Sequence, residues 1–468
     1  MSTVVIGTGL AGLACANQLL ELNESVVLLD KTGTIGGNSS KASSGINGAH
    51  STTQQELKVE DTADLFFGDT QKSAKGLGSP ELMKKLAEDS HLAIEWLQKN
   101  FDLKLDVLAQ LGGHSVARTH RSSGKLPPGF EIVSTLSKRL KEVAESNPER
   151  CKILLNSTVV DVKLGEGKQI TGVVYKDESG KENTLETNNV VFCTGGFGFS
   201  KEMLKKYAPE CVDLPTTNGP HTTGDGQRLL ETLGADLIDM THIQVHPTGF
   251  VDPADPDSGS KFLAAEALRG HGGILLNPIT GKRFVNELTT RDVVTEAIQS
   301  QCPKDKNNAY LVMGEGIYEV YKNNLDFYMF KKLVKKVTIK EFVEESKLPI
   351  SAEDLAKDLA TYNTASADEF GRSLVTRNFG DNITPETNIF VGQVTPVVHF
   401  TMGGAKIDTN AAVLDKNGNP LAKGLYAAGE VSGGVHGANR LGGSSLLECV
   451  VYGRTAAKCI AQKGGARL

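Results

Sequence analysis

The chain has 468 residues, of which 39% are hydrophobic and 23% are charged, which is typical of a folded globular enzyme and not of a disordered chain. This length exceeds what one hydrophobic core usually supports, so two or three domains are expected. The formal net charge of −6 gives no electrostatic reason to expect nucleic acid or an anionic membrane as a partner.

The seven cysteines are scattered, and none is spaced as CxxC or CxxCH. This pattern argues against a disulfide framework, a thiolate zinc site and covalent haem, and no metal site is predicted. No apolar run reaches membrane-spanning length, and a strand pattern begins at Val4, so we expect a soluble, cytoplasmic protein. The alternative compartments are the mitochondrion and the lumen of the endoplasmic reticulum, if a leader was removed from a longer chain.

The first thirty residues predict a strand, a turn, a helix and a second strand. Residues 3–6 are β-branched and apolar, 13–22 have the apolar spacing of a helix, and 25–29 form another buried strand. This order is that of a βαβ unit.

A glycine motif, Gly7-x-Gly9-x-x-Gly12, joins the first strand to the helix. The free N–H groups and the positive dipole end of such a helix suit a pyrophosphate. Asp30 follows at the end of the second strand, where a carboxylate can accept hydrogen bonds from a ribose. The motif therefore predicts a dinucleotide site, although it does not separate FAD from NAD.

The middle of the chain changes character near residue 241. Before that point the periodicity predicts helices over 79–99 and 134–145 and strands over 152–162, 170–175 and 185–193. After it, prolines become frequent, and helical blocks follow over 317–336 and 351–362. We interpret this second stretch as an inserted domain, after which a glycine-rich segment closes with a helix over 444–461.

Two later segments favour FAD over NAD by resemblance. Residues 190–196 (VVFCTGG) and 424–430 (GLYAAGE) resemble the second and third flavin-contacting segments of flavoproteins that have two dinucleotide domains. In such proteins the third segment carries an acidic residue near the ribitol, which here would be Glu430. The positive end of the final helix, near Ser445, could face the flavin and stabilise negative charge on it.

The inserted stretch is dense in Arg, His and Glu within glycine-rich surroundings. The planar fork of an Arg binds two carboxylate oxygens at once, and His adds donors that its neighbours can tune. Any one of these residues could instead be a structural ion pair, as Glu266 three residues before Arg269 illustrates. Their joint occurrence favours a site that clamps a small dianion.

The strings 246–250 (HPTGF), 286–292 (NELTTRD) and 395–404 (TPVVHFTMGG) resemble the fumarate reductase and succinate dehydrogenase flavoprotein superfamily, and within it the soluble fumarate reductases of yeasts. The resemblance runs from Val4 to about Ala461. It implies an α/β fold in which a Rossmann-like FAD-binding domain is interrupted by an inserted α+β capping domain that carries the substrate site. The expected boundaries are 1–241 and 399–468 for the FAD-binding domain and 242–398 for the capping domain.

The resemblance also implies a role for each residue of the cluster. Arg291 would donate the proton, and Glu266 and Arg269 would form the relay that reprotonates it. The clustered charge of the neighbouring arginines would make Arg291 a stronger acid. The expected substrate-binding residues are His246, His399, Arg440 and Gly403. The expected FAD-binding residues are Gly7, Gly9, Leu10, Ala11, Gly12, Asp30, Lys31, Gly36, Gly37, Asn38, Ser39, Ser44, Gly45, Thr194, Gly195, Asp225, Glu430, Ser445 and Leu446.

Two positions depart from the relatives. Membrane-bound relatives attach FAD covalently through a His, and the matching position here is Asn38, so non-covalent FAD is expected. Bacterial soluble relatives often carry a Thr just before the relay Glu, where this chain has Ala265, so one hydroxyl contact is lost or replaced. The run 114–121, rich in His and Arg, has no assigned role.

The implied function is the irreversible reduction of fumarate to succinate, in anaerobic redox balance. The sequence has no haem motif, iron–sulfur cysteine cluster or second nucleotide fingerprint, so the electron donor is external, and the yeast resemblance implies reduced FMN or FAD. An L-aspartate oxidase, a urocanate reductase or another enoate reductase would keep the fold and change the substrate, although a dicarboxylate clamp disfavours urocanate. A flavoprotein subunit docked to an iron–sulfur partner would need covalent FAD and an added C-terminal domain. We expect a monomer that works alone.

Overall fold

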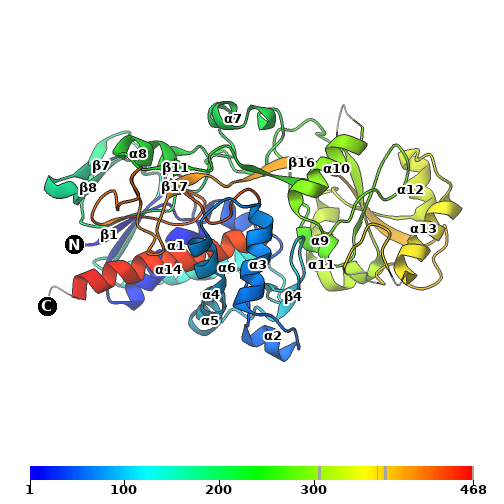
Figure 1. Cartoon of the computed structure of the whole chain (residues 1–468), viewed down its shortest axis with the longest axis horizontal. Coiled ribbons are helices and arrows are strands. Elements are labelled where there is room, and N and C mark those ends of the chain that lie inside the picture. The colour runs from blue at the N-terminus through cyan, green and yellow to red at the C-terminus, as the bar shows by residue number, and fades with distance from the viewer. Residues whose placement is uncertain (304–306, 366, 374–376, 466–468) are drawn as a thin grey trace.

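The computed structural model describes residues 1–303, 307–365, 367–373 and 377–465 (Figure 1). The α-helices are α1 (Leu10–Glu21), α2 (Thr52–Glu56), α3 (Ala63–Ala74), α4 (Pro80–Glu88), α5 (Ser90–Phe101), α6 (Pro128–Ser146), α7 (Lys201–Tyr207), α8 (Asp225–Leu233), α9 (Glu266–Gly270), α10 (Arg291–Gln301), α11 (Glu315–Phe330), α12 (Ile339–Ser346), α13 (Ala352–Thr364) and α14 (Ser444–Gly465). The strands are β1 (Thr3–Ile6), β2 (Val26–Leu29), β3 (Ile46–Asn47), β4 (Val107–Ala109), β5 (Thr119–Arg121), β6 (Cys151–Leu154), β7 (Thr158–Leu164), β8 (Ile170–Lys176), β9 (Glu182–Glu186), β10 (Val190–Phe192), β11 (Leu237–Ile238), β12 (Ile243–Phe250), β13 (Ile274–Leu276), β14 (Ala309–Met313), β15 (Lys335–Thr338), β16 (Asn388–Thr401), β17 (Gly404–Lys406), β18 (Leu425–Ala427) and β19 (Ser432–Gly433).

A parallel sheet in the order β18-β10-β1-β2-β6 organises the first part of the molecule. Its strands are short, nearly continuous runs of Val, Leu and Ile, because parallel strands of this kind are covered on both faces. Helices α1, α6 and α14 pack beside it in one hydrophobic core. The βαβ unit predicted from the first thirty residues is confirmed as β1, α1 and β2.

The turn between β1 and α1 needs glycine at two positions. Gly7 has a φ of 104°, and a Cβ there would lie 2.3 Å from the carbonyl oxygen of Cys193. A Cβ on Gly12 would lie 1.9 Å from the carbonyl oxygen of Gly7. Both glycines therefore let α1 approach the sheet closely, which places the N-terminus of α1 at the carboxyl ends of the strands.

The second sheet is antiparallel in the order β12-β16-β14-β13, with β15 also paired to β16. Successive residues of its strands point to opposite faces. Leu311 and Met313 of β14 lie in the core that includes α11, whereas Val312 between them lies in the core that includes α12 and α13. Helices thus cover both faces of this sheet.

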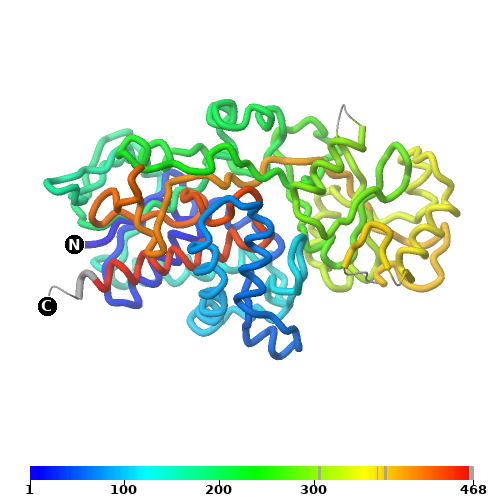
Figure 2. Tube along the Cα trace, viewed as in Figure 1, coloured from blue at the N-terminus to red at the C-terminus, as the bar shows by residue number. Residues whose placement is uncertain are grey.

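Strand β16 connects the two parts of the molecule. In Figures 1 and 2 it runs from the side that carries both termini to the side that carries α10 to α13. The α/β class that the sequence predicts is confirmed. We propose the predicted division into 1–241, 242–398 and 399–468, whose first boundary lies just before β12 and whose second lies within β16.

Several predicted elements are divided in the structure. The helix predicted over 79–99 is two helices, α4 and α5, which meet at Asp89. The strand predicted over 152–162 is β6 of the first sheet followed by β7 of another sheet, and 185–193 is likewise divided into β9 and β10. In the first of these strands, Asn156 adopts a left-handed φ of 51°, which a pattern of apolar residues does not reveal.

One predicted helix ends early. The helical block over 317–336 ends with α11 at Phe330, and residues 335–338 form β15 along the edge of β16. Pairing with β16 therefore outweighs the helical pattern in this segment. The helix predicted over 351–362 is confirmed as α13, and the one predicted over 444–461 is confirmed as α14, which extends to residue 465.

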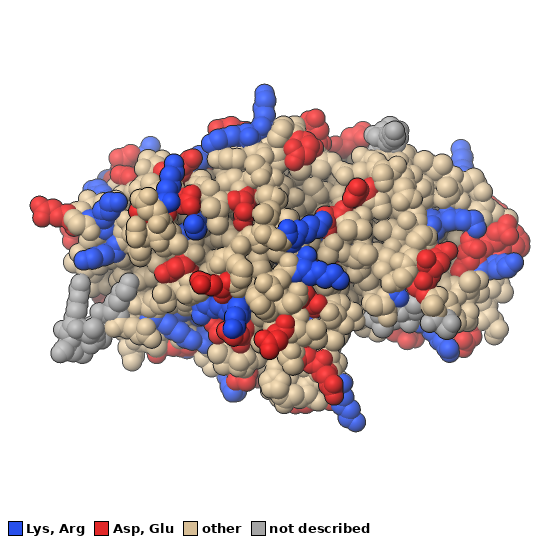
Figure 3. All heavy atoms as spheres, in the orientation of Figure 1, with Lys and Arg blue, Asp and Glu red and all other residues tan. Residues whose placement is uncertain are grey.

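Charged side chains of both signs are interspersed over the face seen in Figure 3. Within the described residues, no helix combines the length and the hydropathy that crossing a bilayer would require. All seven cysteines are described, and all except the partly exposed Cys459 are buried.

Candidate active site

A cavity of about 750 Å³ extends from the β1–α1 turn to the second sheet. Most of the residues expected to bind FAD line it, namely Gly7, Gly9, Leu10, Ala11, Asp30, Lys31, Gly37, Asn38, Ser39, Ser44, Gly45, Thr194, Gly195, Asp225, Glu430, Ser445 and Leu446. Gly12 and Gly36 have packing roles instead, since a Cβ on Gly36 would lie 2.9 Å from Cγ1 of Val133.

The cavity fits a dinucleotide. Helix α1 begins at its wall, and the N-cap residue, Gly9, has no side chain to cap the helix. A Cβ on Gly195 would meet nothing within 4 Å, and the buried hydroxyl of Thr194 makes no hydrogen bond in the described structure. The Ser39 hydroxyl accepts a hydrogen bond from the backbone nitrogen of Leu10 at 3.1 Å, at the start of this helix. Open space, the other N–H groups of the first helical turn and an unpartnered hydroxyl are what a pyrophosphate and its sugars need.

Asp30 also organises the turn around it. Its Oδ2 accepts hydrogen bonds from the backbone nitrogen of Thr8 at 2.8 Å and from the Thr8 hydroxyl at 2.6 Å, and its Oδ1 accepts from the backbone nitrogen of Thr32 at 2.9 Å. Lys31 is paired with Asp225 at 2.5 Å. A ribose at this end would therefore meet a carboxylate that its neighbours already hold in place.

Asn38 joins the two loops that border the cavity. Its Nδ2 donates to Oδ1 of Asn218 and to Oγ1 of Thr222, both at 2.8 Å, and its Oδ1 accepts from the backbone nitrogen of Gly219 at 2.9 Å. The side chain at the position that carries the covalent linkage in membrane-bound relatives thus holds segment 218–222 in this chain.

Glu430 lies on the cavity wall beside Thr401, whose backbone nitrogen and hydroxyl donate to its Oε1 at 2.9 and 3.1 Å. Burial raises the pKa of Glu430 to about 7, against the lowering effect of these two hydrogen bonds. Near neutrality this carboxyl group can therefore donate as well as accept a hydrogen bond.

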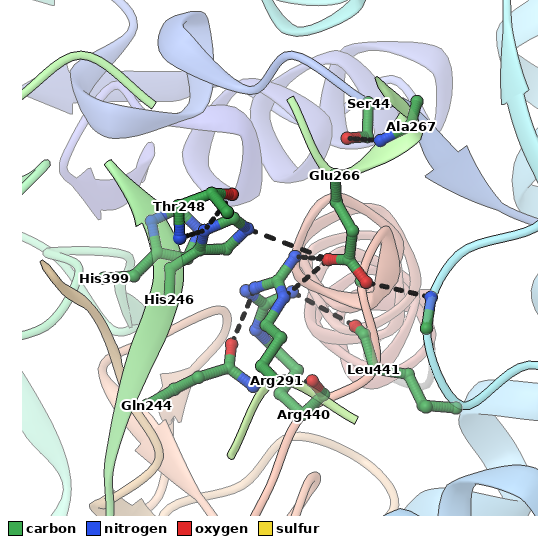
Figure 4. Close-up of polar contacts among 12 residues, drawn as sticks. Ser44, Gln244, His246, Thr248, Glu266, Ala267, Arg291, His399, Arg440 and Leu441 are labelled. Atoms are coloured by element: carbon green, nitrogen blue, oxygen red, sulfur yellow. Dashed lines mark hydrogen bonds and ion pairs between the residues drawn. The ribbon is translucent and has the colours of Figure 1, made fainter. Parts of the chain in front are cut away.

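Arg291 and Glu266 form a buried ion pair at the other end of the cavity (Figure 4). Arg291 is the first residue of α10 and Glu266 is the first residue of α9. Nε and Nη2 of Arg291 each lie 2.6 Å from Oε2 of Glu266. Oε1 of Glu266 accepts from the backbone nitrogen of Gly112 at 2.9 Å. Burial alone would raise the pKa of Glu266, but the charges of Arg291 and Arg269 hold it at about 2.

His246 and His399 come from neighbouring strands, and their ring centroids are 5.2 Å apart. The pairing of β12 with β16 shifts register where Val245 opposes Val398, which leaves His399 as the extra residue of a β-bulge. Bulges of this kind redirect side chains. Burial and nearby arginines lower the pKa of both histidines well below its ordinary value, so both rings are neutral.

Arg440 stacks on the ring of Phe400, with its guanidinium carbon 4.4 Å from the ring centroid. Its Nε is buried without a hydrogen-bond partner in the described structure. Burial, together with the charge of Arg291, lowers the pKa of Arg440 to about 9. An uncompensated guanidinium at the cavity wall is suited to bind an anionic group.

Sequence reasoning missed Gln244. Its Oε1 accepts from Nη1 of Arg291 at 2.8 Å, and its Nε2 donates to the carbonyl oxygen of Arg440 at 2.6 Å, so it joins two of the predicted site residues. A signal was available, because Gln244 lies two residues before His246 in a strand, and such residues share a face.

Arg269 lies behind the ion pair and does not line the cavity. Its Nη2 is 4.0 Å from Oε1 of Glu266, and its Nη1 donates to the carbonyl oxygen of Glu287 at 2.7 Å. The buried guanidinium groups of Arg269, Arg291 and Arg440 thus lie around the carboxylate of Glu266. The carboxyl groups of Glu430 and Glu448 also act on Arg440 and balance part of this positive charge.

Two further expectations concern residues away from the cavity. Gly403 does not line it, since a Cβ there would lie 2.4 Å from Cα of Met240. The unassigned run 114–121 forms a buried network in which Arg118 is bound by Asp61 and Asp69, and His114 contacts the carbonyl oxygen of Gly442 at 3.0 Å. This network supports the loop that carries Arg440.

Comparisons with known proteins agree with this geometry. Residues 2–446 match the family described as FAD binding domain. Fumarate reductase 1 of Saccharomyces cerevisiae is 67% identical to this chain over 461 residues, covering 98% of each chain. The fumarate reductase of Schizosaccharomyces pombe is 43% identical, covering 97% of this chain and 88% of its own. The solved open conformation of a flavocytochrome c3 fumarate reductase matches with a TM-score of 0.74 and 33% identity, covering 98% of this chain and 78% of that one.

Proposed function

The chain belongs to the FAD binding domain family, and from this membership we propose that it irreversibly reduces fumarate to succinate. The reaction takes place in the part of the cavity that Arg291, His399 and Arg440 line. The chain is an FAD-dependent oxidoreductase of the fumarate reductase type. The observation that carries the proposal is that the buried guanidinium groups of Arg291 and Arg440 both line the FAD cavity, where they can bind the carboxylates of fumarate.

Different side chains would bind the two carboxylates of fumarate, one a guanidinium and the others imidazole rings. Arg440 offers an unpartnered Nε and a planar fork, which suits two carboxylate oxygens. His246 does not line the cavity. It accepts at Nδ1 from the backbone nitrogen of Thr248 at 3.1 Å, so its neutral ring carries the proton on Nε2, which faces Oε2 of Glu266 at 3.8 Å. His399 accepts or donates at Nδ1 with the Thr217 hydroxyl at 2.8 Å. These groups would orient the substrate while Arg291 faces its double bond.

Bound FAD, once reduced, supplies the hydride to one alkene carbon. Arg291 donates the proton to the other carbon, and Glu266, which touches two of its nitrogens, returns a proton to it. Arg269 would resupply Glu266, and its Nη2 must move closer than the present 4.0 Å for that transfer. Gln244 holds Nη1 of Arg291 and so fixes the direction of the donor.

Arg291→Ala tests the proposal. The variant should retain FAD and lose fumarate reduction, because the proposed proton donor is removed. The measurement is anaerobic: the bound flavin is reduced, fumarate is added, and flavin reoxidation is followed together with succinate formation. Substantial flavin reoxidation in the variant would refute the role of Arg291, and no succinate from the unaltered enzyme would refute the function itself.

We also propose that FAD is held without a covalent bond, because the Asn38 amide makes three hydrogen bonds to the 218–222 loop. Acid precipitation should then release all of the flavin into the supernatant. Flavin that stays with the protein pellet would contradict this proposal.

The proposed electron donor is reduced free FMN or FAD. At the cavity wall the rings of Phe130, Phe262 and Phe327 are 48%, 47% and 44% exposed, and Lys41 and Lys261 line the same cavity. Exposed aromatic rings suit a planar isoalloxazine, and the two lysines suit its phosphate.

Phe262→Ala separates the donor step from fumarate reduction. The variant should have a KM for reduced FMN several-fold higher, whereas reoxidation of its pre-reduced FAD by fumarate should be unchanged. Phe330→Ala is the matched control, since Phe330 is 80% exposed and does not line the cavity. Equal KM values for reduced FMN in both variants would rule out this docking place.

A further inference from the structure

The short helix α9 carries both members of the proposed relay, since it begins at Glu266 and includes Arg269. Its N-cap residue is Ala265, which has no side-chain oxygen and makes no capping hydrogen bond. A helix of one turn has no stability of its own. The position of the Glu266 carboxylate therefore depends on what holds the first N–H groups of α9.

Ser44 supplies the missing cap from a distant part of the chain. Its hydroxyl accepts a hydrogen bond from the backbone nitrogen of Ala267 at 3.3 Å, and this contact is drawn above Glu266 in Figure 4. Ala267 is the second residue of α9, the position whose N–H an N-cap side chain normally satisfies. Ser44 is itself buried and lines the FAD cavity.

Helix α11 fixes both partners of this contact. The Tyr321 hydroxyl donates to the carbonyl oxygen of Ser43 at 2.8 Å. About two turns further along, the Tyr328 hydroxyl lies 3.1 Å from the carbonyl oxygen of Leu263 and 3.3 Å from the backbone nitrogen of Ala265. The segment around Ser44 and the segment that leads into α9 are thus both hydrogen-bonded to α11, which bends at Tyr321, and these bonds hold the two sides of the Ser44–Ala267 contact.

We infer that Ser44 is a positioning residue for the proton relay. It caps α9 in place of residue 265, so that the wall of the FAD cavity sets the Glu266 carboxylate against Nε and Nη2 of Arg291. The inference rests on the relay of the proposed function. It also explains why residue 265 can be an alanine, because Ser44 of the FAD-binding part provides the capping hydroxyl that Ala265 lacks.

The cap matters because the Glu266 carboxylate is held closely. Its Oε2 lies 2.6 Å from two nitrogens of Arg291, and its Oε1 lies 2.9 Å from the backbone nitrogen of Gly112. Loosening the first turn of α9 would lengthen these contacts without removing any charge. Return of the proton to Arg291 would then slow, whereas binding of the fumarate carboxylates to Arg440 and His399 would be retained.

Ser44→Ala in the FAD-loaded enzyme tests the inference. We expect kcat to fall about fivefold, which corresponds to the roughly 1 kcal/mol of a lost cap. The solvent deuterium isotope effect on kcat should rise, and the KM for fumarate should stay within about twofold. Ser43→Ala is the matched control, because the Ser43 hydroxyl makes no hydrogen bond of acceptable geometry within the described residues.

A rescue variant makes the test specific. Ala265→Ser places a hydroxyl at the N-cap itself, where the backbone has the extended ψ of 128° that capping requires. The double variant of Ser44→Ala with Ala265→Ser should recover most of kcat and the original isotope effect. Failure of the rescue, or a loss in Ser44→Ala explained by weaker FAD binding or a shifted flavin potential, would overturn the inference.

Amide hydrogen exchange separates this inference from the proposed function. Peptides that cover 265–270 should exchange faster in Ser44→Ala, and the Ala265→Ser change should restore their protection, whatever reaction the enzyme catalyses. Unchanged exchange in Ser44→Ala would refute the cap, whereas no succinate from the unaltered enzyme would refute the proposed function and leave the cap standing.

Discussion

Single side chains decide how the two loops around the cavity are held together. The Asn38 amide uses both its donor and its acceptor atoms on segment 218–222, with three hydrogen bonds of 2.8 to 2.9 Å. A histidine there could not make this set of contacts, because its ring presents one donor and one acceptor when neutral. The Asn38 side chain thus joins the two loops of this chain through hydrogen bonds, as a latch.

Asn38→Ala should release FAD faster. Losing the latch removes hydrogen bonds worth about 0.5 to 1.5 kcal/mol each, so the dissociation rate of FAD should rise roughly tenfold. Stopped-flow transfer of FAD to an excess of an apoflavoprotein measures this rate. Ser40→Ala is the control, since among the described residues the Ser40 hydroxyl bonds only to the carbonyl oxygen of Gly37 in its own loop, and equal rates for both variants would exclude the latch.

At the scale of elements, the site is built where helices and strands begin or lose their regular pairing. Glu266 and Arg291 are the first residues of α9 and α10. His246 and His399 lie where the pairing of β12 with β16 shifts register. These places give side chains directions that a regular element would not allow, and they bring residues of four elements to one end of the cavity.

The contact between β1 and α1 depends on Gly12. Gly12→Ala should destabilise the protein by more than 1 kcal/mol and weaken FAD binding, since the new Cβ would overlap the carbonyl oxygen of Gly7. Gly68→Ala in α3 is a matched helical control, because a Cβ there meets nothing within 4 Å. It should raise stability by about 0.5 to 1 kcal/mol. Urea unfolding with FAD titration measures both effects, and equal stability changes would contradict the close packing.

At the scale of the whole molecule, many titratable groups are buried in unusual protonation states. Burial lowers the pKa of His114, His120 and His271 to about 4. Glu430 shifts the other way, to about 7. These histidines therefore stay neutral in the folded protein at pH values where the unfolded chain would bind protons at them, which is below about pH 6.5.

Stability should consequently fall as the pH is lowered from 6.5 toward 4. A lowered histidine pKa in the folded state gives stability that is complete above the unfolded value and is lost below it, at about 1 to 2 kcal/mol for each histidine by pH 5. The raised pKa of Glu430 makes the opposite contribution to stability between pH 4.5 and pH 7, but this one group is outnumbered by the five histidines His114, His120, His246, His271 and His399, whose pKa burial lowers.

Urea unfolding at pH 7 and pH 5 checks this prediction. His120→Gln should flatten the pH dependence, because His120 is fully buried between the Ser51 hydroxyl and the carbonyl oxygen of Arg118. The surface variant His91→Gln should leave it unchanged. A protein more stable at pH 5 than at pH 7 would refute the assignment of neutral buried histidines.

The pattern of residues along short stretches of the sequence was enough to predict much of the fold. The βαβ unit, the glycines of the first turn and the final helix depend on contacts within about thirty residues, and all are confirmed. Where a break depends on distant partners, as at Asn156 between two sheets or at β15 on the edge of β16, the sequence pattern predicted continuous elements and was wrong.

The sequence by itself determined the dinucleotide turn, the family and the set of charged residues, because each depends on residue type at short spacing. Only the tertiary structure decided which of those residues meet. It put Gln244 between Arg291 and Arg440, moved Gly403 into packing against Met240, and bound Ser44 to α9. Such contacts join residues far apart in the chain, and their distances follow from how two sheets and their helices pack, which no local pattern records.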